Sequence, residues 1–479
     1  MRMHSLSISR KRFFLIFIWL LIILVEYVFI KNYGMTSYGN NSGLAVLFFC
    51  VLCLQLISLR ISGIPIVSFF TIFLVLLYFF HFGQLFCMAI VDDSMFSVAN
   101  MFRTQMGDIN ITKKTILVSA MSINGVFLGG LLSHNYSYEI YSDRTIEEEF
   151  DSLSFKVCFQ FAKVAFWISL PLRLYIDIRQ FIGAVVAGYS ATADFTVSGI
   201  VSCIAGFWYV SVALLAICIQ NKKTRKIVTS IFLGYMFITM LIGARGHQLV
   251  NIIGILLVLY YANETKIKLS SIIKYAVLGF AVLTLINMIL LTRGESISYL
   301  FNNFGQVMTS AVQNNVVIQT LTELGATIRT PYLVIRGKGN LFNPFFGETI
   351  FRSLLACIPG IDAIIPNTQS AIFSRTLNSA YHITGLGGSF VGEMYYDFGN
   401  LYWVFSILLG FIHCDLSNRI IKSLKQKNLR EICLYLPFLM YSLWWVRDTF
   451  CGLARSVVWL LLLYYIVRGV CLRNKSMRA

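Results

Sequence analysis

Apolar blocks long enough to cross a membrane recur along almost the whole chain. The hydrocarbon core of a bilayer takes a helix of about 20 apolar residues, and about twelve blocks approach or reach that length. The pattern predicts an all-α polytopic membrane protein with about 12 transmembrane helices. The predicted spans are 13–30, 44–61, 64–90, 114–133, 156–178, 198–219, 227–243, 248–262, 272–292, 396–415, 432–446 and 452–468.

The composition agrees with this pattern. Apolar residues make up 57% of the 479 residues and charged residues only 13%, whereas soluble chains carry roughly 45–50% and 25%. The sequence has no phosphate-binding Walker loop, no dinucleotide fingerprint and no HExxH motif. It therefore argues against an ATP-driven pump, and we expect neither a cofactor nor a metal. Most of the 11 cysteines lie inside apolar blocks, where small packing residues are typical.

The net charge of +17 comes largely from basic clusters that each border an apolar block. Such clusters mark cytoplasmic loops of membrane proteins, so we expect no nucleic-acid partner. If the N-terminus lies in the cytoplasm, every cluster falls on the cytoplasmic side of the predicted spans. An even number of spans then returns the C-terminus to that side. We therefore expect both termini to be cytoplasmic, with basic clusters at 2–12, 222–226, 266–268, 419–430 and 468–478.

Residues 293–388 interrupt the apolar pattern and, in this orientation, form one large periplasmic loop. The loop divides the chain into nine N-terminal spans at 1–292, the loop itself, and three C-terminal spans with a cytoplasmic tail at 389–479. Four of the chain's seven prolines lie in the loop, and prolines break helices and fix turns.

Two short helices are predicted within this loop. Apolar residues at helical spacing indicate an amphipathic helix at 345–358, with Glu348 and Arg352 one turn apart on its other face. A second short helix is expected at 313–326 and carries Glu323. Long ordered loops of this kind are usually functional.

Arginines in and beside the loop oppose the positive-inside bias. A charged group near the membrane costs free energy to desolvate unless something pairs with it. A guanidinium holds two phosphate oxygens at once, so several of them would suit a membrane-anchored diphosphate. Alternatively, they pair with acidic loop residues simply to fold the loop. The candidates for substrate binding are Arg245, which is flanked by glycine at the outer end of the seventh span, and Arg293, Arg329 and Arg375.

Residues 381–399 join a glycine-rich stretch to the tenth predicted span. The glycines predict a backbone that turns tightly or approaches a ligand closely. Glu393 follows them at the membrane boundary, where it could act as an acid–base group. The alternative is that Glu393 only complements a helix dipole. His382 and Glu323 are the other candidate proton acceptors, and Tyr396 is a candidate substrate contact.

Three of these motifs resemble the Wzy-type O-antigen polymerases, which are oligosaccharide repeat-unit polymerases of the bacterial inner membrane. They are Gly-Ala-Arg-Gly at 243–246, Arg-Gly at 293–294, and Gly-Gly-Ser-Phe-Val-Gly-Glu-Met-Tyr-Tyr-Asp-Phe-Gly at 387–399. The resemblance covers the whole chain in topology and chiefly residues 243–399 in sequence. One departure is the third outer loop, which has only Arg179 where some members carry an arginine-to-glycine repeat. The family is also similar to GT-C-like membrane glycosyltransferases.

The resemblance implies glycosyl transfer at the periplasmic face. A hydroxyl of an acceptor repeat unit would attack the anomeric carbon of a glycan on undecaprenyl diphosphate, and the lipid diphosphate would leave. The arginines would hold this leaving group, and Glu393, Glu323 or His382 would accept the proton. The partners would be the undecaprenyl-diphosphate-linked donor and acceptor, membrane lipid and a chain-length regulator protein.

Three alternatives stay open. An O-antigen ligase would share the fold and the arginine-rich outer face, and would differ in its acceptor. A flippase or other transporter of lipid-linked oligosaccharide would share the span count, but the long loop and the dissimilar halves of the chain argue against it. A scaffold protein would not need glycine-flanked arginines at the outer boundary.

Overall fold

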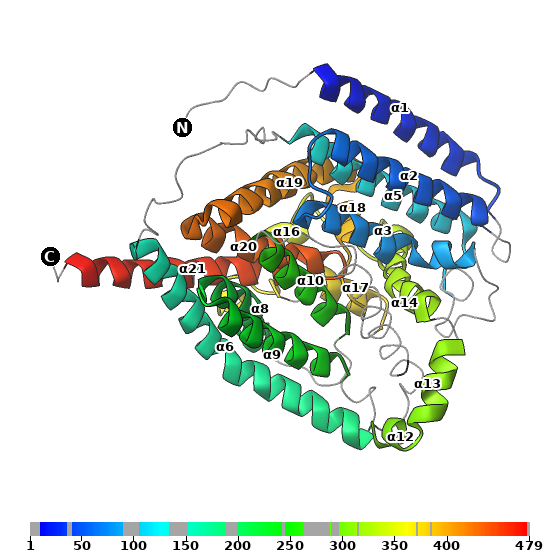
Figure 1. The fold of residues 1–479 in the computed structure, drawn as a ribbon. Helices are drawn as coiled ribbons and strands as arrows, with labels where there is room; N and C mark the ends of the chain where they lie inside the picture. Colours follow the sequence, from blue (N-terminus) through cyan, green and yellow to red (C-terminus); the bar gives the residue numbers. More distant parts are fainter. Residues whose placement is uncertain are drawn as a thin grey trace.

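The computed structural model describes most of the chain as helices packed into one bundle (Figure 1). The described residues are 10–35, 41–89, 105–133, 152–187, 199–241, 245–262, 288, 297–313, 316–369, 372–383 and 386–476. Within them every regular element is a helix, which confirms the predicted fold class at the level of an all-helical protein.

The first half of the chain holds eight described helices before the loop. They are α1 (Arg10–Asn32), α2 (Ser42–Ile61), α3 (Phe69–Met88), α5 (Ile109–Leu132), α6 (Ser152–Ala187), α8 (Gly199–Cys218), α9 (Lys222–Leu241) and α10 (Arg245–Ala262). Each of them overlaps one of the first eight predicted spans. The ninth predicted span, 272–292, lies outside the described residues apart from Met288.

The second half holds the short loop helices and the last long ones. They are α12 (Ile297–Asn302), α13 (Phe304–Gln313), α14 (Val316–Gly325), α15 (Arg329–Gly337), α16 (Glu348–Leu355), α17 (Phe373–Ala380), α18 (Phe390–Phe398), α19 (Tyr402–Gln426), α20 (Leu429–Trp445) and α21 (Phe450–Ser476), with 3-10 turns η2 (Ala326–Ile328), η3 (Ile361–Ala363) and η4 (Gly399–Leu401). The two predicted loop helices are present as α16 and α14. In α16 the Nε of Arg352 lies 3.0 Å from Oε1 of Glu348, as the spacing predicts.

Eight helices within the described ranges are long and apolar enough to cross a membrane: α1, α2, α3, α5, α6, α8, the α18–α19 stretch and α21. The chain is therefore a multi-pass membrane protein by the length and composition of its helices. The apolar part of α10 is shorter, at 246–262. The count of twelve spans stays a prediction.

The tenth predicted span is divided rather than continuous. Residues 396–415 were expected to form one helix, but α18 ends at Phe398 and α19 begins at Tyr402 after the turn η4. Gly399 causes the break because its φ of 53° lies in the left-handed region, which glycine adopts without strain. The short helix α18 is thereby separated from the long helix that follows it.

Small residues let α5 and α19 pack with their backbones in close contact. A Cβ added to Gly129 would overlap the carbonyl oxygen of Ile407, and one added to Gly410 would overlap that of Val126. Such glycine contacts are typical of helix pairs in membranes, where close packing replaces the hydrophobic driving force.

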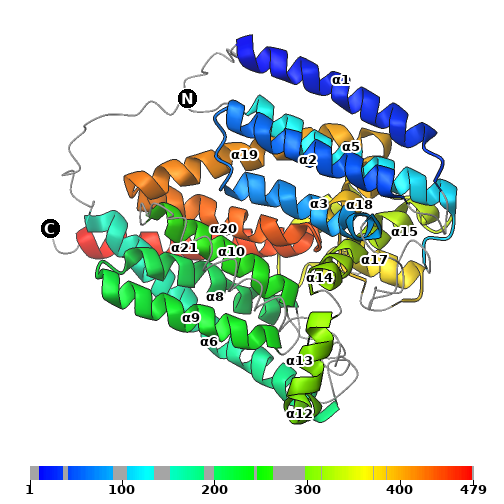
Figure 2. The same cartoon turned by 45° about the vertical axis from the view of Figure 1, so that its right-hand side comes forward.

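The start of α1 and the ends of α2, α5 and α10 lie at one end of the bundle, which we call the tail end. Arg12, near the start of α1, donates to the carbonyl oxygens of Ser62 and Ser133, which follow α2 and α5. Tyr261, near the end of α10, donates to the carbonyl oxygen of Val67 just before α3. In Figure 2 the first residues of α1 and the last of α21 both lie on the left.

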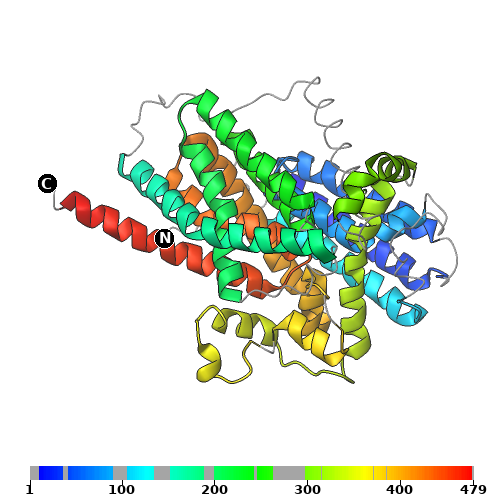
Figure 3. The same ribbon diagram turned by 90° about the horizontal axis from the view of Figure 1, so that it is seen from below.

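The helices of the loop lie at the opposite end of the bundle, which we call the loop end. α14 packs on the last turns of α3, where Gln84 Nε2 donates to the carbonyl oxygen of Thr322 at 3.1 Å. Arg455, near the start of α21, donates to the carbonyl oxygen of Ala356 after α16 at 2.8 Å. Figure 3 shows the yellow segment that holds α16 and α17 gathered at the edge of the bundle. The loop helices therefore lie together at one end rather than along the bundle.

Candidate active site

Glu393 lies at the loop end, on the first turn of α18, and its side chain is fully buried. Its Oε2 accepts hydrogen bonds from the indole Nε1 of Trp445 at 2.9 Å and from the backbone N of Phe450 at 2.8 Å. Phe450 begins α21, so this oxygen meets the positive end of a helix dipole. Its Oε1 has no hydrogen-bond partner in the described part of the chain. One oxygen is therefore held by the protein, and the other is left for a further donor.

Ser389 fixes the point at which α18 begins. Its backbone is extended and its Oγ accepts a hydrogen bond from the backbone N of Gly392 at 3.2 Å, as in an N-cap. His81, buried on α3, lies with its Nε2 3.0 Å from this Oγ and its Nδ1 2.9 Å from the carbonyl oxygen of Leu77. The contact orients the first turn and hence Glu393. His81 was missed, although a histidine inside an apolar span is a signal that could have found it.

Asp397 lies one turn after Glu393 and binds the start of another helix. Its Oδ1 accepts from the backbone N of Thr349 at 2.8 Å, and its Oδ2 accepts from the Thr349 hydroxyl at 2.6 Å. Thr349 is the second residue of α16. The two carboxylates of α18 thus stabilise the N-termini of α21 and α16, and α18 connects both helices.

Two lysines lie around the ring of Tyr395 at the other end of α18. Lys338, which follows α15, donates from Nζ to the carbonyl oxygens of Tyr395 and Tyr396, both at 3.0 Å. The Nζ atoms of Lys338 and Lys114 lie 5.1 and 5.7 Å from the centroid of the Tyr395 ring. Burial lowers the pKa of Lys338, Asp397 opposes this effect, and Lys114 adds to it. This cationic pair was not among the predicted site residues, because its two lysines are 224 positions apart in the sequence.

The glycine-rich stretch before α18 packs against a turn between α20 and α21. A Cβ added to Gly388 would overlap the backbone of Asp448, and one added to Gly387 would lie 3.1 Å from the carbonyl oxygen of Arg447. The predicted close approach is present, but here the neighbour is backbone of the same chain. Asp448 Oδ1 accepts from the backbone N of Thr449 at 2.8 Å. Burial raises the pKa of Asp448 to about 6.

The predicted Arg329 begins α15, directly beside this stretch. The Thr330 hydroxyl donates to the carbonyl oxygen of Gly387 at 3.2 Å, and the backbone N of Pro331 would lie 3.4 Å from a Cβ on Gly392. Arg329 is partly buried and has no hydrogen-bond or ion-pair partner in the described part of the chain. The first turn of α15, which Arg329 begins, therefore contacts the segment that carries Glu393.

The predicted Arg245 is the first residue of α10, and its side chain lies outside the described part of the structure. The two residues after it pack on Trp444. A Cβ added to Gly246 would lie 3.2 Å from the Trp444 ring, and the His247 and Trp444 ring centroids are 5.1 Å apart. Trp445, the next residue, donates to Glu393. The start of α10 and Glu393 thus contact neighbouring residues at the end of α20.

A buried polar cluster extends this region beneath the start of α10. Arg173 and Asp177, one turn apart on α6, form an ion pair, with Nε 2.8 Å from Oδ2. Tyr235 also donates to Asp177. The Arg173 guanidinium lies 5.4 Å from the centroid of the Tyr209 ring, which is 5.0 Å from the ring of His247. An arginine and an aspartate inside an apolar span form a sequence signal that was overlooked.

The other predicted residues differ in their surroundings. Arg375 is exposed and donates to the carbonyl oxygen of Gln369 at 3.2 Å. His382 is exposed with a φ of 51°, and Glu323 is partly buried on α14. The Tyr396 ring is buried between Phe342 and Phe373, at centroid distances of 5.1 and 5.5 Å. Their roles stay predictions, and Arg293 lies outside the described residues.

The arrangement combines a buried carboxylate with nearby cationic groups. A carboxylate oxygen with no partner can accept a proton from a bound hydroxyl. Guanidinium and ammonium groups at the same end can hold an anionic leaving group. The described residues contain no group of three or more histidine, cysteine, aspartate or glutamate side chains that could hold a metal ion. The site is therefore equipped for acid–base chemistry on an anionic substrate.

Comparison with known proteins gives one finding. A family model described as O-antigen polysaccharide polymerase Wzy matches residues 12–475, which is nearly the whole chain. No curated protein and no solved structure matches.

Proposed function

Because the chain belongs to the O-antigen polysaccharide polymerase Wzy family, we propose that it joins lipid-linked oligosaccharide repeat units into a surface polysaccharide. The substrates are a glycan and a single repeat unit, each on undecaprenyl diphosphate, and the reaction takes place at the periplasmic face of the bacterial inner membrane. The observation that supports a specific active site is the buried Glu393, whose Oε1 has no hydrogen-bond partner in the described part of the chain.

The reaction is a balanced glycosyl transfer. A hydroxyl oxygen of the acceptor sugar forms a bond to the anomeric carbon of the donor, and the bond from that carbon to the diphosphate oxygen breaks. The proton of the hydroxyl passes to a general base, and undecaprenyl diphosphate leaves with the bonding electrons. No nucleotide or metal enters this step, because the diphosphate is already a good leaving group.

Glu393 is the proposed general base. Trp445 and Phe450 hold its Oε2 in place, so Oε1 is the oxygen that can receive the proton of the acceptor hydroxyl. A base must lie within hydrogen-bond reach of the proton that it removes, and an oriented carboxylate contributes about 10²–10⁴-fold in rate. Glu323, which is partly buried on α14, and His382, which is exposed, are the alternatives.

The leaving group is proposed to bind cations around the two ends of α15. Arg329 lies at its start, and Lys338 follows its end. Lys114 of α5 lies with Lys338 around the Tyr395 ring. A diphosphate needs several donors aimed at its oxygens as charge develops. Arg245, Arg293 and Arg375 retain the substrate-binding role that the family resemblance gives them.

Two features support a periplasmic location of the proposed active site: the basic residues at the tail end and the position of the loop helices at the other end. The tail end carries the start of α9 with its exposed Lys222 and Lys223, as expected for a cytoplasmic face. The loop helices lie at the other end. We therefore propose a GT-C-like membrane glycosyltransferase of the inner membrane, with both termini cytoplasmic, twelve spans and a chain-length regulator protein as partner.

A deletion strain tests this function. Its lipopolysaccharide should lose the ladder of long chains on a gel and keep one repeat unit on the lipid core. Complete loss of attached sugar would contradict the proposal and favour the ligase or flippase interpretation, whereas an unchanged ladder would exclude all three.

A further inference from the structure

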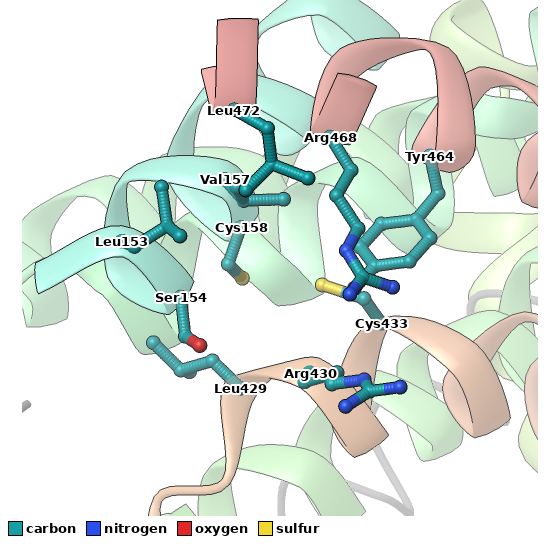
Figure 4. Close-up of a pocket in the computed structure, with 10 residues that line it drawn as sticks. All are labelled: Leu153, Ser154, Val157, Cys158, Leu429, Arg430, Cys433, Tyr464, Arg468 and Leu472. Carbon is teal, nitrogen blue, oxygen red and sulfur yellow. The ribbon is translucent and has the colours of Figure 1, made fainter. Parts of the chain in front are cut away.

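A pocket at the tail end has no place in the proposed reaction. It lies where the start of α6, the start of α20 and the end of α21 meet, and its volume is about 120 Å³ (Figure 4). Its lining combines apolar side chains with two guanidinium groups. The lining includes Leu153, Ser154, Leu429, Arg430, Arg468 and Leu472.

The two arginines of the pocket lack a counter-charge. Neither Arg430 nor Arg468 has a hydrogen-bond or ion-pair partner within the part of the chain that the structure describes. Both side chains line the same small pocket, as Figure 4 shows. Glu431, the carboxylate next in sequence, accepts from the Ser423 hydroxyl at 2.5 Å. Two like charges without a partner repel, and an anion between them removes that repulsion.

The backbone adds to the preference for an anion. Leu153 and Ser154 belong to the first turn of α6, and Leu429 and Arg430 to the first turn of α20. Helix N-termini carry a partial positive charge. Two helix starts and two guanidinium groups therefore surround one small space.

The size and the surroundings of the pocket identify the source of the anion. A cavity of about 120 Å³ has room for a phosphate group but not for a whole lipid. Leu472, an apolar lining residue on α21, is 43% exposed, and Val470 and Ile466 of the same helix are 55% and 63% exposed. A phosphate in the pocket could thus belong to a lipid whose acyl chains lie along α21.

We propose that this pocket binds the phosphodiester headgroup of an anionic phospholipid from the leaflet at the tail end. Arg430 and Arg468 hold the phosphate oxygens, and the first turns of α6 and α20 contribute backbone dipoles. The site lies at the opposite end of the bundle from Glu393, so it is independent of the proposed glycosyl transfer.

Native mass spectrometry of the full-length protein in neutral detergent tests the proposal, with phosphatidylglycerol as the probe and phosphatidylcholine as the reference lipid. The R430Q/R468Q variant should lose about tenfold or more in phosphatidylglycerol affinity, since charge-assisted hydrogen bonds are the strong ones. The R430K/R468K variant, which keeps both charges, should keep most of the binding. The matched control is K222Q/K223Q, which removes two exposed charges outside the pocket.

Three outcomes would overturn the site. The first is equal phosphatidylglycerol binding by R430Q/R468Q and by K222Q/K223Q, which would mean non-specific attraction. The second is a rise in melting temperature with inorganic phosphate as large as the rise with phosphatidylglycerol, which would make the ligand a free anion. The third is phosphatidylglycerol binding that appears only after Glu147, Glu148 and Glu149, which precede α6 in the sequence, are changed to glutamine. That result would mean that the unmodified protein does not bind the lipid at this pocket.

Discussion

At the scale of single residues, the two oxygens of Glu393 have different surroundings. Oε2 accepts two hydrogen bonds, whereas Oε1 has none in the described part of the chain. A purely structural carboxylate that caps α21 would need only the first oxygen. The second oxygen favours a catalytic role for Glu393, because a buried polar atom without a partner costs free energy unless a ligand forms a hydrogen bond with it.

Glu393→Gln should abolish long chains while leaving the amount of protein near normal. The glutamine carbonyl can still accept from Trp445 and Phe450, but it cannot take a proton, so polymer formation should fall about 100-fold or more. Gel analysis of surface polysaccharide, with immunoblotting of the protein, measures both effects. Glu431→Gln at the tail end is the matched control and should keep the ladder. A normal ladder from Glu393→Gln would remove this residue from the mechanism.

Asp448 gives a prediction about pH. Its pKa is raised from 3.8 to about 6 in the folded protein, so the folded state holds this proton more tightly than the unfolded state. The contribution of Asp448 to stability is therefore greatest below pH 4 and is lost as pH rises through about 6. Asp448→Asn should be more stable relative to the unmodified protein at pH 7 than at pH 4, by melting temperature. An equal difference at both pH values would show that Asp448 does not titrate in this way.

Some of the candidate residues were readable from the sequence and others were not. Glu393 stood out because a carboxylate at a membrane boundary is costly. Lys338 and Lys114 did not, because only folding brings α5 and the loop together around Tyr395. Arg173 and Asp177 could have been found, since their spacing of four places both on one face of an apolar helix.

At the scale of elements, α18 holds the site together. Its two carboxylates bind the N-termini of α21 and α16, and Lys338 binds carbonyls near its end. The predicted span 396–415 covers only the last three residues of α18, and the sequence did not predict the separation of α18 from α19. That separation depends on the backbone of Gly399, and hydropathy does not distinguish a left-handed glycine from a helical one.

Gly388→Ala tests the packing of the stretch that leads into α18. A Cβ would overlap the backbone of Asp448, so the turn between α20 and α21 must shift. Overpacking of this kind costs about 1–3 kcal/mol. The purified variant should therefore melt at a lower temperature and make shorter chains. Gly234→Ala on α9, where nothing lies within 4 Å, is the control and should melt as the unmodified protein does. Equal melting of both variants would contradict the close packing.

At the scale of the whole molecule, helix ends that are far apart in the sequence lie together at the tail end and at the loop end. Arg12 joins the start of α1 to the ends of α2 and α5, and α14 packs on the end of α3. Hydropathy predicted the positions of these helices, because a helix that crosses a bilayer needs a long apolar stretch. The orientation inferred from the basic clusters stays a prediction. Neither pattern could predict how the loop helices fold over one end, since those contacts depend on long-range packing.

Reporter fusions test the orientation. Alkaline phosphatase fused after Asn340 should be active, because this part of the loop is expected in the periplasm. The same enzyme fused after Lys427, between α19 and α20, should be inactive, and a fluorescent protein fused there should fluoresce. The reverse pattern at both positions would contradict the proposed face of the reaction.

The central claim is that this chain alone links lipid-borne repeat units and uses Glu393 as the base. The most direct measurement combines the purified protein in lipid nanodiscs with an undecaprenyl-diphosphate-linked repeat unit and no nucleotide sugar. We predict glycans of increasing repeat number and one undecaprenyl diphosphate released per linkage. For Glu393→Gln we predict a rate lower by about 100-fold or more. Absence of any linkage by the folded protein, or an equal rate for Glu393→Gln, would contradict the account.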